Sequence, residues 1–140
     1  MIKDLIALAM AVIFFTIALA HFYWAFFAKI ISPKVIPHVD GKPAFIPSKA
    51  ITVFVGIVFI ILTAFVAIMS LHWQSSLLNP FYQIAGSLLT FIFLLRAIGD
   101  FKLVGFFKKI KNSEFAFFDT RYWSPLCAIL AIFMAYLTWL

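Results

Sequence analysis

Residues 50–71 read AITVFVGIVFIILTAFVAIMSL, a mainly apolar run that contains no charged side chain. The hydrocarbon core of a bilayer is about 30 Å thick, and an α-helix needs about 20 residues to cross it. A run of this length and composition therefore predicts a transmembrane helix. We therefore expect the chain to be an all-α integral membrane protein.

The composition of the whole chain supports this assignment. Of the 140 residues, 66% are hydrophobic and only 11% are charged, whereas a soluble domain carries about 25% charged residues. The formal net charge is +6, which in a membrane protein favours contact with anionic lipid headgroups. The sequence contains no nucleic-acid-binding motif, so we expect no nucleic acid as a partner.

Three further runs are also long and apolar enough to cross a bilayer. The four expected spans cover residues 5–28, 50–71, 80–101 and 123–140. In the fourth span, Ser124 suits an N-cap and Pro125 suits the first helical position. No sequence block repeats and no flexible linker divides the chain. We therefore expect one domain over residues 1–140, an up-down bundle of four helices with a short interfacial segment between helices three and four.

Basic residues are distributed asymmetrically about these spans. Every Lys and Arg except Lys3 falls in the two long loops, taken as residues 29–49 and 96–121. Basic residues concentrate on the cytoplasmic side of membrane proteins. We therefore expect a multi-pass protein of the bacterial inner membrane, with both termini outside and both long loops in the cytoplasm.

The stretch LLRAIGDFKLVGFFKK, residues 94–109, puts opposite charges at the end of the third span. The span is too short for the bilayer core unless its helix continues to Asp100 or Phe101, which places Arg96 and Asp100 on one helix face. Each charge is costly to bury alone, so each is expected to have a partner. Because a basic residue preceding an acidic one is the weaker order for such a pair, Asp100 is also expected to interact with Arg121, a backbone amide or a ligand.

Other polar side chains fall at the same cytoplasmic depth. We call this set the inner cup, and it consists of His21, Tyr23, Arg96, Asp100, Asp119, Arg121 and Tyr122. Arginine suits phosphate or carboxylate groups, and the aspartates would orient the arginines or exchange protons with a substrate. In the alternative, structural interpretation, Arg96 reaches the headgroups, Asp100 neutralises it, and His21 is a packing residue.

A lipid-contacting segment is expected between spans three and four. The stretch GFFKKIKNSEFAFF, residues 105–118, mixes phenylalanines with lysines and suits a segment that lies in the headgroup plane. The residues expected to contact anionic lipid are Phe106, Phe107, Lys108, Lys109 and Lys111. No span carries metal-binding spacings of Cys, His or Glu, and there is no glycine-rich phosphate loop, so we expect neither a metal nor a cofactor.

Several strings resemble those of a known family. LLRAIGDFKLVGFFKK (94–109), FAFFDTRYWSPLC (115–127) and the loop 37–47 are similar to the small bacterial membrane proteins of domain-of-unknown-function family 3995. The resemblance implies a four-helix integral membrane protein but carries no activity. It further implies that the family signature includes Arg96, Gly99, Asp100, Phe101, Gly105, Phe106, Phe107, Asp119, Thr120, Ser124 and Pro125.

The sequence leaves three functions open. The first is binding of a lipid-like anionic amphiphile at the inner cup, with or without a reaction on it. The second is a small transporter or channel subunit, which is disfavoured because the middle thirds of the spans hold no ionisable residue. The third is an accessory subunit of a larger membrane complex, in which the cup is structural. The partners left open are a second copy of the chain in a homo-oligomer, as in a dimeric transporter, and such a complex. We favour the first, with membrane lipids as partners.

Overall fold

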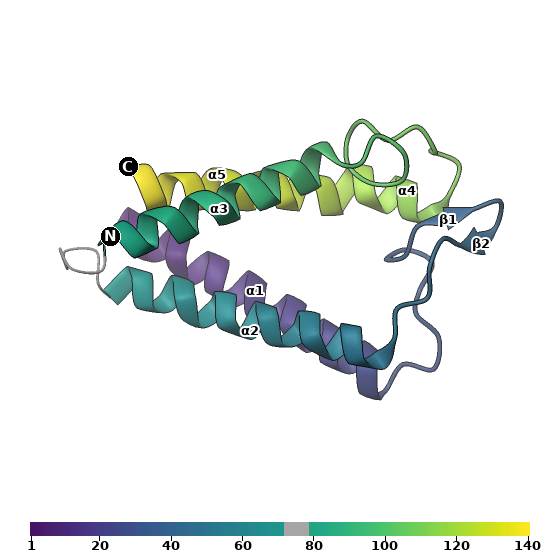
Figure 1. Cartoon of the computed structure of the whole chain (residues 1–140), viewed down its shortest axis with the longest axis horizontal. Helices are drawn as coiled ribbons and strands as arrows, with labels where there is room; N and C mark the ends of the chain where they lie inside the picture. The colour runs from purple at the N-terminus through teal and green to yellow at the C-terminus, as the bar shows by residue number, and fades with distance from the viewer. Residues whose placement is uncertain (72–78) are drawn as a thin grey trace. The chain divides into compact units, whose positions relative to one another are not determined.

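The computed structural model describes residues 1–71 and 79–140 and is mainly helical (Figure 1). Within these residues, four helices are long and apolar enough to cross a membrane, over Ile2–Phe26, Lys49–Leu71, Pro80–Ile98 and Glu114–Trp139. The all-α membrane fold that the hydropathy predicts is therefore confirmed.

The helices are α1 (Ile2–Phe26), α2 (Lys49–Leu71), α3 (Asn79–Ile98) and a fourth, made of the consecutive segments α4 (Glu114–Phe118), η1 (Asp119–Trp123) and α5 (Ser124–Trp139). The strands β1 (His38–Val39) and β2 (Lys42–Pro43) form an antiparallel hairpin in the loop after α1. By contact, the chain divides into two compact units, which are described separately.

The first unit comprises residues 1–29, 47–86 and 136–140. Within it, α1 and α2 run side by side in opposite directions (Figure 1). The buried side chains of α1 recur every three or four residues and so form one helix face, made of Ala7, Met10, Phe14 and Ala18. The ring centroid of Phe14 lies 5.8 Å from that of Phe59 on α2. This apolar pairing of two helices forms the core of the first unit.

The second unit comprises residues 30–46 and 87–135 and holds the inner-cup residues other than His21 and Tyr23. Its hairpin turns at Asp40 and Gly41, whose φ angles of 50° and 76° fit the two-residue turn that requires two positive φ values. The indole N–H of Trp123 donates to the carbonyl of Lys34 at 3.0 Å. This bond ties the loop that carries the hairpin to the fourth helix.

Helix α3 ends at Ile98, earlier than the thickness of the bilayer predicts. The next residue, Gly99, has a φ of +92°, in the left-handed region where glycine commonly terminates a helix. Asp100 therefore lies outside the helix. It does not share a helix face with Arg96, as the expected continuation to residue 101 required.

The fourth helix begins at Glu114, well before the expected start near residue 123. Ser113 is its N-cap, and the hydroxyl of this serine accepts the N–H of Ala116. Ser124 therefore caps nothing and lies buried inside the helical run. The helix widens into the π-turn η1 in the five residues before Ser124 and Pro125, and Pro125 has no N–H to donate. The segment between helices three and four is correspondingly shorter than the sequence predicts.

Candidate functional site at Asp119

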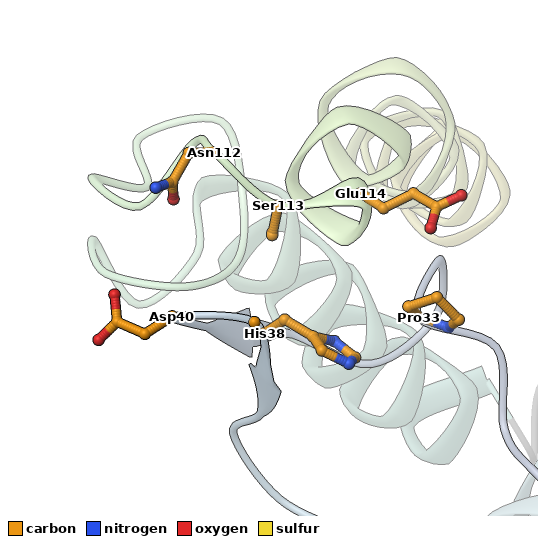
Figure 2. Close-up of a pocket in the computed structure, with 7 residues that line it drawn as sticks. Pro33, His38, Asp40, Asn112, Ser113 and Glu114 are labelled. Atoms are coloured by element: carbon orange, nitrogen blue, oxygen red, sulfur yellow. The ribbon is translucent and has the colours of Figure 1, made fainter.

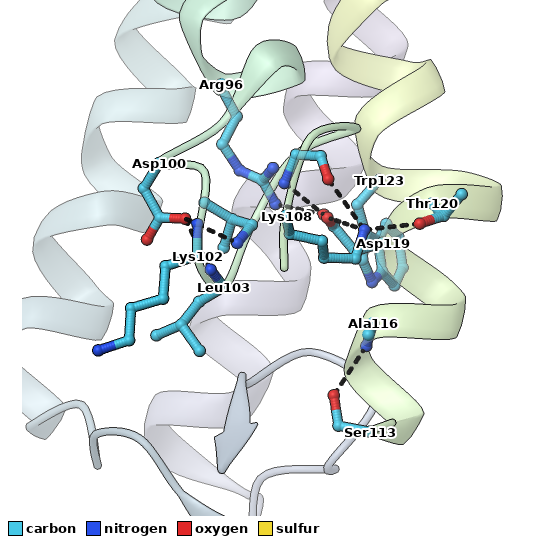
Figure 3. Close-up of polar contacts among 12 residues, drawn as sticks. Arg96, Asp100, Lys102, Leu103, Lys108, Ser113, Ala116, Asp119, Thr120 and Trp123 are labelled. Carbon is cyan, nitrogen blue, oxygen red and sulfur yellow. Dashed lines mark hydrogen bonds and ion pairs between the residues drawn. The ribbon is translucent and has the colours of Figure 1, made fainter. Parts of the chain in front are cut away.

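Asp119 is the centre of a buried polar cluster in the second unit, and none of its surface is exposed. Its Oδ1 accepts a hydrogen bond from Nη2 of Arg96 at 2.9 Å. Its Oδ2 accepts two, from the N–H of Gly105 at 2.7 Å and from Nζ of Lys108 at 3.1 Å (Figure 3). We call Arg96, Gly105, Lys108, Asp119 and Thr120 the Asp119 cluster.

Lys108 is also buried, with 1% of its side chain exposed. Its ammonium donates to Oδ2 of Asp119, to the carbonyl of Gly105 at 2.9 Å and to Oγ1 of Thr120 at 2.6 Å. An ammonium group has three N–H donors, so all three are used. Lys108 thus departs from the expected contact with lipid headgroups, because the buried carboxylate needs a nearby positive charge. Lys109, the next residue, is exposed.

A backbone contact between two glycines positions this loop. Gly99 and Gly105 have φ angles of +92° and +87°, and a Cβ on either one would overlap backbone atoms of the other side of the loop. The N–H of Phe106 donates to the carbonyl of Ala97 in α3 at 2.8 Å. The loop therefore folds back onto the end of α3, which brings the amide of Gly105 to the carboxylate of Asp119.

Asp100 stabilises the same loop through hydrogen bonds to its backbone. Its Oδ1 accepts three backbone N–H groups, those of Lys102, Leu103 and Val104, at 2.9, 2.7 and 3.1 Å (Figure 3). Burial opposes ionisation of this carboxyl, but the three N–H groups outweigh burial and lower the pKa of Asp100. Of the partners that the sequence suggested, the backbone amide is the one observed. Within residues 1–71 and 79–140, the carboxylate that pairs with Arg96 is Asp119.

The remaining inner-cup residues of the second unit face outward. Arg121 is exposed, and so is Tyr122, whose ring stacks on that of Phe118 with the centroids 5.6 Å apart. The structure thus joins Arg96 and Asp119 in one hydrogen-bonded cluster. Arg121 and Tyr122 follow Asp119 closely in sequence but lie on the surface.

His21 and Tyr23 belong to the first unit. Nδ1 of His21 lies 2.8 Å from the carbonyl oxygen of Ile17, which requires the proton on Nδ1, and its ring stacks on Phe59. These contacts match the packing role that was the alternative for His21. Tyr23 is exposed and stacks on Phe27.

Sequence reasoning placed Gly105 and Thr120 only in the family signature and assigned Lys108 to lipid contact. It did not predict that these three residues belong to one cluster with Asp119. Gly105 could have been recognised from its spacing to Gly99, since two glycines that flank an aspartate indicate a tight loop with positive φ angles. The inward direction of Lys108 has no sequence signal of its own, because its neighbours Lys109 and Lys111 are exposed lysines.

The second unit also contains a cavity of about 220 Å³, lined by Pro33, His38, Asp40, Gly41, Asn112, Ser113 and Glu114. Figure 2 shows the carboxylates of Asp40 and Glu114 pointing to opposite sides, away from the imidazole of His38. In the part of the chain that the structure describes, no group of three His, Cys, Asp or Glu residues could hold a metal ion. The cavity therefore presents no convergent set of ligands.

The sequence model of the family described as "Protein of unknown function (DUF3995)" matches residues 14–134. The chain belongs to this family. The DUF3995 match includes every residue of the Asp119 cluster, and it confirms the resemblance seen in the sequence strings. No curated protein and no solved structure matches the chain.

Proposed function

We propose that the chain binds the anionic head group of an amphiphile at the end of the second unit formed by residues 99–122. The observation that carries this proposal is the charge balance of that surface. Its exposed cations are Lys102, Lys109, Lys111 and Arg121. Two of its three carboxylates are occupied, because Asp100 accepts three backbone N–H groups and Asp119 is buried between two cations. The third, Glu114, is exposed and lies 4.0 Å from Nζ of Lys34, so the exposed cations still outnumber the exposed carboxylates.

Exposed aromatic rings accompany these cations. They belong to Phe101, Phe106, Phe107, Phe117 and Tyr122. Rings of this kind settle at the boundary between headgroups and acyl chains, while neighbouring lysines reach the lipid phosphates. The combination favours an amphiphile over a small soluble anion, since an anion alone would gain nothing from the rings.

The asymmetry of the basic residues supports placing this end of the unit at the inner leaflet of a bacterial inner membrane. The cytoplasmic leaflet carries anionic lipids, so the proposed ligand is available there. In this proposal the Asp119 cluster holds the loop in the conformation that displays the exposed cations.

The experiment is native mass spectrometry of the whole protein released from nanodiscs that contain equal amounts of phosphatidylglycerol and phosphatidylcholine. The test variant is Lys109→Gln/Arg121→Gln, and the control is Lys3→Gln, which removes the one basic residue expected on the outer side of the membrane. Each basic residue near an anionic surface contributes about 1 kcal/mol, so the loss of two should leave the test variant with about thirtyfold less phosphatidylglycerol than the wild type. Equal retention of the two lipids by the wild type would refute the proposal.

A further inference from the structure

The cavity of the second unit lacks a convergent set of metal ligands, but its size suits a small organic group. Its volume is about 220 Å³. Pockets that enclose a drug-sized ligand measure about 300–1,000 Å³, so this cavity takes only part of a lipid. A water molecule occupies about 30 Å³ of the liquid, which gives the cavity room for about seven groups of that size. A small head-group substituent therefore fits, whereas acyl chains do not.

Two segments form the walls of the cavity, and direct contacts hold them together. One is the loop at 33–41, and the other is the start of the fourth helix at 112–114. The indole N–H of Trp123 donates to the carbonyl of Lys34 at 3.0 Å, and Nζ of Lys34 lies 5.0 Å from the ring centroid of Phe118. These contacts fix the loop against the helix. The cavity is therefore formed before a ligand arrives, as is usual for binding sites.

Three side chains on the cavity wall suit hydroxyl groups. Nδ1 of His38 lies 2.8 Å from the carbonyl oxygen of Ile36 and so carries the proton, which makes Nε2 an acceptor in the uncharged ring. Oγ of Ser113 accepts the N–H of Ala116 at 3.1 Å, which leaves its O–H to donate. The amide of Asn112 can donate and accept, and within the described residues it has no hydrogen-bond partner. Hydroxyl groups also donate and accept, so they match this mixed set.

The charges on the cavity wall disfavour the other kinds of head group. The charged side chains among the described residues that line it are Asp40 and Glu114, both acidic, so the cavity repels a phosphate. An ammonium group would need carboxylates that converge on it, but Figure 2 shows these two pointing to opposite sides. Glu114 also lies 4.0 Å from Nζ of Lys34. An uncharged group that carries hydroxyls is the class that fits.

Lys111 connects this cavity to the surface of the proposed function. It is one of the exposed cations of residues 99–122, and it directly precedes Asn112 on the cavity wall. We propose that the cavity binds a glycerol or a similarly small polyol carried by the phosphate of an anionic phospholipid, while the exposed cations hold the phosphate. The inference rests on the proposed function and deepens it, because it names the chemistry of the head group.

The test is isothermal titration calorimetry of the whole protein in an uncharged detergent with two short-chain lipids, phosphatidylglycerol and phosphatidylmethanol. Each carries one negative charge on its phosphate, but the second has a methyl group in place of the glycerol. The wild type should bind phosphatidylglycerol about tenfold more tightly, which corresponds to one or two hydrogen bonds. Asn112→Leu keeps the branched shape of the side chain and removes the amide. It should reduce the preference to about threefold and leave the affinity for phosphatidylmethanol unchanged.

The matched control is Lys109→Gln/Arg121→Gln, which leaves the cavity wall intact. It should weaken the binding of both lipids to the same extent and so keep the tenfold preference. The unfolding midpoint of Asn112→Leu in a denaturing detergent should equal that of the wild type, because the exposed amide has no partner in the described part of the chain. A lost preference then reports on the cavity and not on unfolding.

The outcomes separate the two proposals. If the wild type binds both lipids equally and still retains phosphatidylglycerol over phosphatidylcholine in nanodiscs, the inference fails and the proposed function stands. A tenfold preference that survives in Asn112→Leu would also overturn the inference. Tighter binding of phosphatidylethanolamine than of phosphatidylglycerol would overturn it in favour of an ammonium group. If the wild type binds neither anionic lipid, both proposals fail.

Discussion

Replacing Asp119 by asparagine keeps the shape of the side chain and removes its charge, which tests whether the Asp119 cluster holds the second unit together. The variant leaves the ammonium of Lys108 without a counter-ion although only 1% of that side chain is exposed. Breaking a buried ion pair by removing one partner costs about 3–5 kcal/mol. Arg96 should contribute less to this loss than Lys108, because 34% of its side chain is exposed.

The double variant provides the decisive comparison. Lys108→Met alone leaves Asp119 with Arg96 and the N–H of Gly105, so we expect a loss of about 1–3 kcal/mol. Adding it to Asp119→Asn removes the stranded ammonium. The loss in the double variant should therefore fall short of the sum of the single losses by about 2 kcal/mol.

The assay is reversible unfolding of each variant in mixed micelles, followed by tryptophan fluorescence as the fraction of denaturing detergent rises. Lys109→Met is the control, because it changes an exposed lysine next to Lys108 and should alter the free energy of unfolding by no more than about 0.5 kcal/mol. Additive losses in the double variant, or a loss in Asp119→Asn as small as in the control, would refute the reasoning.

Three other perturbations probe the loop and the topology. Gly105→Ala should lower the free energy of unfolding by more than about 2 kcal/mol because it adds backbone overlap to a positive φ, whereas Gly41→Ala, with nothing within 4 Å of its added Cβ, should cost only about 1–2 kcal/mol. Because the pKa of Asp100 is lowered in the folded state, the contribution of this carboxylate to stability is complete at neutral pH and is lost as the pH falls below about 4. The free energy of unfolding, measured between pH 6 and pH 3, should therefore depend less on pH in Asp100→Asn than in the wild type. An unchanged pH dependence would contradict this. A cysteine at position 112 should resist an impermeant thiol reagent in intact cells and one at position 3 should react, whereas the reverse pattern would overturn the expected orientation.

The four spans could be predicted because hydrophobicity over about 20 residues is a local property of the sequence. The ends of two helices could not be placed from the same signal. Bilayer thickness argued for continuing the third helix to residue 101, whereas Gly99 ends it by adopting a left-handed conformation. The Ser124–Pro125 pair has the composition of a helix start, yet Ser113 caps the helix eleven residues earlier and a π-turn precedes the proline.

The pairing of side chains in the Asp119 cluster depends on distances in the folded protein, which the spacing of residues in the sequence does not give. Arg96 and Asp100 stand at helical spacing and were expected to pair, but the pairing residue, Asp119, lies 23 positions away from Arg96. The sequence did place Asp119 in the inner cup at the same depth. The sequence did not predict that the loop folds back and buries the side chain of Lys108, because the direction of that side chain follows from tertiary contacts.

Loops on protein surfaces ordinarily tolerate added residues, because longer connections cost little entropy. Residues 99–105 should not tolerate added residues in this way. The two glycines meet backbone to backbone, and Asp100 binds three successive N–H groups between them, so the number of residues in this stretch is fixed by geometry. An inserted residue would move the N–H of Gly105 away from Asp119. We therefore expect insertions and deletions among relatives to fall beyond Ile110 and never inside this stretch.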